Sequence, residues 1–260
     1  MKTVFLHIAL LLSCFAAQAQ SAQQVEQEIN AHLKHIQYWR YEYSPEDTVF
    51  KVQVNQQDSI TAANTMLLNY LMKVCNRNAD VLKYDFKLPE NSDMKIVTSD
   101  DKKMKIFSWD THSGDNEHDN YSVFQYETGG GIKVLSKLNG VMGKAYQKVI
   151  FSEPKYYIAI ASDMVADNNS EKTIQVLSIA QNELKTVDAF KEDGKQATNH
   201  LAYTYNYSSN YDFRKMKEEY DVKYEKGKLF IPEVVDYKMT GKYSVYNFNG
   251  ESFILDKNAK

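Results

Sequence analysis

Residues 95–128, KIVTSDDKKMKIFSWDTHSGDNEHDNYSVFQYET, decide the fold of this chain. Apolar and polar side chains alternate through Lys95–Ser99, Met104–Trp109 and Ser122–Thr128, which is the pattern of strands with one face in a core. A pair of aspartates supplies a turn between the first two runs. The stretch therefore predicts consecutive antiparallel strands rather than parallel strands joined by helical crossovers.

The same period of two continues to the C-terminus, interrupted by turn residues such as Gly129-Gly130-Gly131 and Asn249-Gly250. The further strands expected are Leu82–Lys87, Ile132–Ser136, Gln147–Ser152, Tyr156–Ser162, Thr173–Ile179, Asp221–Glu225, Leu229–Val234, Tyr243–Asn247 and Ser252–Leu255. We expect an antiparallel meander that forms a curved sheet or sandwich over residues 79–260. A small irregular β-propeller is the alternative, because strand pairs recur at roughly 40-residue spacing and one strand ends in Trp-Asp.

Two amphipathic helices are expected before the strands. Between Ala22 and Tyr41, four apolar residues recur at spacings of four and three, with polar residues between them. A second apolar stripe begins near Asp58 or Ser59, either of which suits a helix N-cap. Residues 20–78 are therefore predicted to form a helical segment packed on the β body. The fold class is mainly β with an N-terminal helical pair (α+β).

Residues 1–19 have the layout of a secretory signal peptide. A basic start is followed by apolar Thr3–Phe15, and Ala17-Gln18-Ala19 is a small-x-small cleavage site. The apolar run is too short for a transmembrane helix. The protein is therefore expected to be exported, either periplasmic or secreted. Leu11–Cys14 resembles a bacterial lipobox, so lipidation of Cys14 and a lipid-anchored envelope protein form the alternative.

The composition and the absence of several motifs exclude some classes of function. The net charge is −3 and no dense basic cluster occurs, which argues against a nucleic-acid partner. Cys75 is the only cysteine beyond the leader, so an internal disulfide and a zinc–thiolate cluster are excluded. The sequence also lacks Gly-x-Ser-x-Gly, Cys-x-x-Cys and Gly-x-Gly-x-x-Gly. These absences favour a protein that is not an enzyme.

The densest polar cluster, residues 110–119, lies between two expected strands. Asp110, His112 and His118 are the candidate ligands for a divalent metal, because carboxylates and imidazoles suit such ions. A metal-dependent exported hydrolase that uses the Asp110–Asp119 loop is therefore the alternative function. The spacing matches no established ligand pattern, and a solvated hairpin loop without any cofactor explains the cluster without further assumption.

An aromatic stripe is the second candidate site. In a strand, Tyr203, Tyr205 and Tyr207 share one face, and Tyr211 follows just beyond. If exposed, these phenols would stack on sugar rings and hydrogen-bond to hydroxyl groups. If buried, they form the packed face of a sheet.

Two strings, Ser99–Thr111 (SDDKKMKIFSWDT) and Gly241–Phe253 (GKYSVYNFNGESF), resemble an uncharacterised family of exported, β-rich bacterial proteins. The resemblance implies export and a β-rich fold, and it transfers no functional residue. Together with the composition, it leads us to expect a non-catalytic binding or envelope-associated module. Its partner is expected to be a protein or a glycan.

Overall fold

The computed structural model describes residues 20–46, 54–89, 92–113, 119–138, 143–166, 168–206 and 221–258. The expected leader and Cys14 lie outside these residues. In the described part of the chain, no helix is both long enough and apolar enough to cross a bilayer.

The helical pair is confirmed. The helices are α2 (Ala22–Gln37), the π-helix η1 (Tyr38–Glu42), α3 (Gln56–Cys75) and the short α4 (Ala79–Lys83). Ser21 and Gln24 form a reciprocal capping box at the start of α2. Helix α3 begins before the expected Asp58 or Ser59, because the Asn55 side chain accepts from two backbone N–H groups of the first turn.

The described strands form three sheets, which differ in how their strands follow one another. The first sheet contains β1 (Met94–Thr98), β2 (Met104–Asp110), β3 (Asn120–Thr128) and β4 (Gly131–Leu135) in sequence order. The second has the order β10-β7-β6-β5, with β8 also paired to β7, and contains β5 (Tyr146–Ser152), β6 (Tyr156–Ala166), β7 (Asn169–Ala180), β8 (Glu183–Thr186) and β10 (His200–Asn206).

The third sheet consists mainly of the C-terminal strands. Its order is β11-β12-β13-β14-β9, and it contains β11 (Lys223–Glu225), β12 (Lys228–Val235), β13 (Lys238–Phe248), β14 (Phe253–Leu255) and β9 (Phe190–Lys191). In the described part of the chain, all strand pairs are antiparallel except β14 with β9, which is parallel and was not expected. This pair ties the segment after β8 to the last strand of the protein.

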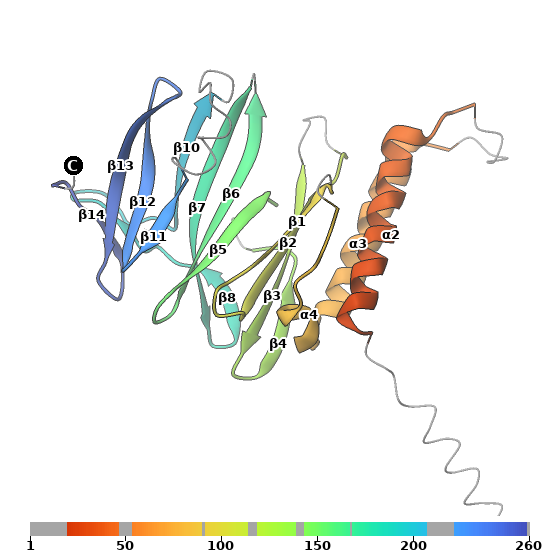
Figure 1. Ribbon diagram of the computed structural model, residues 1–260, viewed down its shortest axis with the longest axis horizontal. Helices are drawn as coiled ribbons and strands as arrows, with labels where there is room; N and C mark the ends of the chain where they lie inside the picture. Colours follow the sequence, from red (N-terminus) through yellow and green to blue (C-terminus); the bar gives the residue numbers. More distant parts are fainter. Residues whose placement is uncertain are drawn as a thin grey trace, which may run out of the picture.

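The sheets stack face to face in a row, with the helices covering one end of the row (Figure 1). On β2, Phe107 and Trp109 pack against the helices, whereas Met104 and Ile106 pack against the second sheet. Both faces of the second sheet are likewise buried, one against the first sheet and one against the third. The expected sandwich is therefore confirmed and extended to four layers. The open row of sheets departs from the propeller alternative.

The predicted strand Leu82–Lys87 is wrong. Leu82 lies in α4, and residues 84–89 run without strand pairing across the first sheet. Two backbone groups of this run bond to side chains instead of to a neighbouring strand. The Tyr84 carbonyl accepts from the Lys105 ammonium group, and the Lys87 N–H donates to the Glu26 carboxylate over 2.6 Å.

Candidate functional site

Asp110 and His112 lie where the end of β2 meets the π-helix η1. His112 has φ of 52°, in the left-handed region that residues other than glycine rarely adopt. Its backbone N–H donates to Asp110 Oδ1 over 2.8 Å, which supports this turn. The Tyr41 ring, from η1, packs edge-on against the His112 ring with centroids 5.6 Å apart. A π-helix and a strained turn therefore contact each other here, and both features are frequent at functional sites.

The imidazole of His112 lies between two carboxylates. Its Nε2 is 3.3 Å from Asp93 Oδ2, and its Nδ1 is 3.6 Å from Asp110 Oδ2. These are ion-pair distances, and only 9% of the His112 side chain is exposed. A neutral imidazole carries one N–H whereas the protonated ring carries two, so two flanking carboxylates favour protonation.

The pKa values follow this arrangement. Asp93, assisted by Asp110, raises the pKa of His112 above its usual 6.5 despite the opposing effect of burial. The contact with His112 holds the pKa of Asp93 below its usual 3.8, against the opposing effect of burial, and a hydrogen bond from Gln37 Nε2 adds to this lowering. Gln37 ends α2, so the pair also attaches the helical layer to the first sheet.

A metal ion is not favoured by this geometry. The two carboxylates contact opposite nitrogens of one ring, so the three side chains do not converge on a single point. Among the described residues, no group of three His, Cys, Asp or Glu side chains is arranged to hold an ion. His118 lies outside these residues, so the predicted ligand set of Asp110, His112 and His118 stays a prediction.

Buried hydrogen bonds attach the site to helix α3. Asn64 of α3 is 1% exposed, and its Nδ2 donates to the Thr111 carbonyl over 2.7 Å. Its Oδ1 accepts from Trp109 Nε1 over 2.9 Å. Thr111 Oγ1 in turn donates to the Asp119 carbonyl over 2.8 Å, across the base of the polar loop. The ends of β2 and β3 are thereby fixed to α3.

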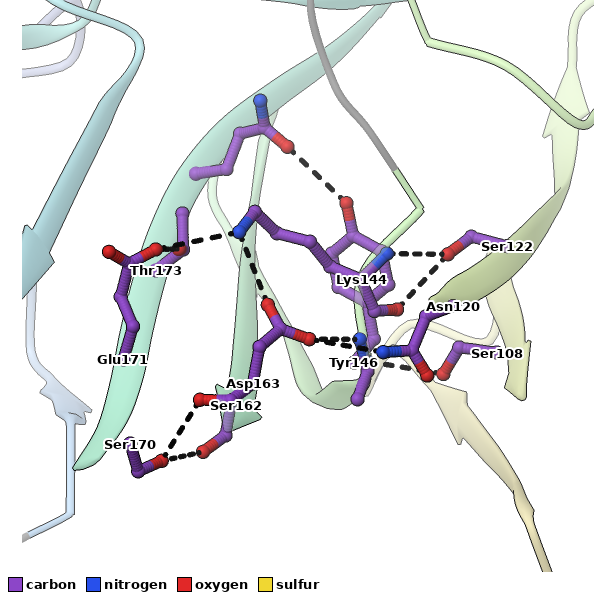
Figure 2. Close-up of polar contacts among 12 residues, drawn as sticks. Ser108, Asn120, Ser122, Lys144, Tyr146, Ser162, Asp163, Ser170, Glu171 and Thr173 are labelled. Carbon is purple, nitrogen blue, oxygen red and sulfur yellow. Dashed lines mark hydrogen bonds and ion pairs between the residues drawn. The ribbon is translucent and has the colours of Figure 1, made fainter. Parts of the chain in front are cut away.

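A second polar network joins the first sheet to the second sheet (Figure 2). Asn120, which pairs with Asp110 across β2 and β3, donates from Nδ2 to Asp163 Oδ1 over 3.3 Å. Figure 2 shows the Lys144 ammonium group between two carboxylates, 3.2 Å from Asp163 and 3.6 Å from Glu171. The charges of this network are paired with one another, which suits a structural connection between layers.

Two of the four tyrosines of the predicted stripe lie within the described residues, and both pack inside the protein. Tyr203 and Tyr205 lie on β10 with ring centroids 6.2 Å apart. Tyr205 is 7% exposed, and Tyr203 packs on the core between the second and third sheets. The Tyr203 hydroxyl is buried without a hydrogen-bond partner in the described part of the chain, and burial raises its pKa. Tyr207 and Tyr211 lie outside the described residues.

Asp93 was not predicted as a site residue, although the register of the β1–β2 hairpin places it opposite Asp110. β1 and β2 pair so that Met94 faces Trp109, and the Asp110 N–H donates to the Asp93 carbonyl. Extending the register by one position places Asp93 opposite Asp110. Had the Ser99–Met104 turn been used to set the register, the two carboxylates could have been paired from the sequence.

The stability contribution of the Asp93–His112 pair is expected to depend on pH. The pKa of His112 is raised from 6.5, so its contribution is complete below pH 6.5 and is lost as pH rises through the folded value. The pKa of Asp93 is lowered from 3.8, so its contribution is present above pH 3.8 and is lost as pH falls through the folded value. The stabilisation is therefore largest between these two reference values.

His112→Asn tests this, because asparagine tolerates the left-handed backbone. Urea unfolding at about pH 5 and about pH 8.5 should show the larger difference between wild type and variant at the lower pH. An equal difference at both pH values would contradict the proposed ion pair.

Comparisons with known proteins identify no relative. No family model matches the chain, and no curated protein or solved structure is significantly similar to it.

Proposed function

We propose that this chain is an exported, non-catalytic binding module of the cell envelope that holds a protein or glycan partner. The observation that carries the proposal is a pair of exposed tyrosine rings near the end of β2 and the start of β3, Tyr41 from η1 and Tyr121 from β3, which we name the aromatic corner. Tyr41 is 66% exposed and Tyr121 is 37% exposed. Large exposed aromatic side chains are typical of binding surfaces.

Each ring of the aromatic corner packs on a buried or nearly buried ring of the protein. Tyr41 packs on the nearly buried His112, and Tyr121 packs edge-on against the fully buried Trp109 with centroids 5.7 Å apart. The Arg40 guanidinium lies 5.9 Å from the Tyr41 centroid and adds a cation to the same surface. Rings fixed in this way lose little conformational entropy when a partner binds.

The polar groups behind the corner serve a supporting role in this proposal. His112 is engaged by two carboxylates, and Lys144 is engaged by two more. Their charges are paired within the protein. The groups offered to a partner are therefore the tyrosine rings and their phenol groups, which suit sugar rings and apolar peptide side chains.

Binding of the purified, labelled protein to a glycan array and to washed envelope preparations tests the proposal. We expect Tyr41→Ala/Tyr121→Ala to weaken binding by about tenfold or more, as for hot-spot residues. Met66→Ala is the matched control, because Met66 is 53% exposed on α3, outside the corner. Unchanged binding by the double variant, or no binding by the wild type, would contradict the proposal.

A further inference from the structure

A second exposed apolar surface lies at the tips of two hairpins, β6–β7 and β12–β13. Its members, which we name the tip residues, are Met164, Val165, Val235 and Tyr237. Their exposed fractions are 41%, 51%, 60% and 56% respectively. Side chains of this size and polarity are normally buried, so four of them together mark an interaction surface.

The two tips lie side by side at one end of the molecule, where β6, β7 and the β12–β13 hairpin all reach the same level in Figure 1. Asn206, at the end of β10, pairs with Asn169 of the β6–β7 hairpin. Its backbone N–H donates to the Tyr237 carbonyl over 2.8 Å. One backbone position therefore joins the second sheet's tip to the third sheet's tip.

The β12–β13 turn is unfavourable in itself, and this is an independent indication of function. Val235 pairs with Lys238, so Asp236 and Tyr237 are the two turn residues, with φ of 50° and 60°. Turns of this geometry favour Asn-Gly, and a tyrosine in the left-handed region is disfavoured. The turn keeps an aromatic ring at the outermost point of the hairpin, where it adds nothing to the core.

We propose that the tip residues dock on the surface of a lipid bilayer, with the tyrosine at headgroup level and the aliphatic side chains just below it. Tyrosine is enriched at membrane interfaces, and shallow insertion of apolar side chains binds proteins to bilayers. Lys238 and Lys242 are exposed on β13 directly behind the tip. Their ammonium groups complement anionic headgroups.

The tip residues are separate from the aromatic corner but lie at the same end of the sheets. Asp163, which immediately precedes the tip residue Met164, accepts a hydrogen bond from Asn120, the neighbour of Tyr121. A bilayer contacted by the tips would therefore lie on the same side of the molecule as the corner. Loss of one surface should leave the other measurable.

Co-sedimentation with vesicles tests the inference. The chain is used from Gln20 onward, because the apolar Thr3–Phe15 run would itself bind lipid. We expect binding to vesicles of phosphatidylethanolamine and phosphatidylglycerol, and weaker binding to phosphatidylcholine vesicles or at high salt. Val165→Ser/Val235→Ser should weaken binding by roughly tenfold. Ile254→Ser is the control, because Ile254 is 38% exposed on the distant β14.

Tyr237→Gly separates binding from folding. Glycine relieves the left-handed turn, so the melting temperature should rise while vesicle binding falls. A wild-type protein that fails to bind vesicles, or tip variants that bind as the wild type does, would overturn the inference. Self-association that the same variants abolish, without vesicle binding, would also overturn it and assign the tips to a second copy of this chain.

Discussion

Gly143→Ala is expected to destabilise the protein by about 3 kcal/mol or more, or to prevent folding. A Cβ atom at this position would lie 1.7 Å from the Asn120 carbonyl oxygen and 2.6 Å from its carbon. These are backbone atoms of β3, which pairs with β2 at this point. The Asn120 side chain is also bonded to Asp163 of the second sheet, so the strand cannot move away without breaking the inter-sheet network.

Urea unfolding followed by circular dichroism measures the effect of this substitution. Gly129→Ala is the matched control, because the nearest atom to its added Cβ, Asn182 Oδ1, would be 3.9 Å away. That variant should lose at most about 1 kcal/mol, the usual range for such a surface change. Equal stabilities for the two variants would show that residue 143 does not approach Asn120 in the folded protein.

Asn64→Leu is expected to cost about 3 kcal/mol, since it removes a fully buried hydrogen-bonding group between α3 and β2. The substitution leaves the Trp109 indole N–H and the Thr111 carbonyl without their side-chain partner. Each buried group left unsatisfied costs about 1–3 kcal/mol. The leucine side chain has the same branching as asparagine but a larger volume, so overpacking at this fully buried position adds to the cost of the lost bonds.

Chemical denaturation monitored by tryptophan fluorescence is suited to this prediction, because Trp109 itself loses a hydrogen bond. Thr65→Ala is the neighbouring control: the Thr65 hydroxyl donates to the Thr61 carbonyl on the exposed side of α3. Its loss should change the free energy of unfolding by less than about 0.5 kcal/mol. A similarly small change for Asn64→Leu would mean that water replaces the amide and that the site is less enclosed than described.

Most strands could be predicted from the sequence, because alternation is a local property of a strand with one buried face. The stacking of the layers could not. In β2, the alternation of Met104, Lys105 and Ile106 indicates an exposed lysine, yet Lys105 is 1% exposed. Its ammonium group lies 4.8 Å from the Phe86 ring centroid, and burial lowers its pKa to about 8. This environment is created by the crossing segment 84–89, which no periodicity reveals.

The candidate site shows the same division. Asp110 and His112 were predicted together because they are neighbours in a polar loop, and the structure places them in contact. Their partners Asp93 and Tyr41 come from distant segments, so loop composition gave no indication of them. The sequence left open whether the tyrosine stripe is exposed or buried, for a related reason. Whether Tyr203 faces solvent depends on the third sheet, most of which is built from residues far along the chain.

Apart from β9, which belongs to the third sheet but precedes β10 of the second, the layers lie in the same order in space as in the chain: helices, first sheet, second sheet, third sheet. A polypeptide that emerges N-terminus first can therefore complete most of each layer before the next is synthesised. Until β12–β14 are synthesised, however, Ile158, Ile160 and Val176 lack the third-sheet residues Leu229, Ile231 and Phe253 that complete their core. Chains that terminate early should expose this apolar surface, aggregate and be degraded. Premature termination near the C-terminus would therefore harm a cell more than the loss of a few residues suggests.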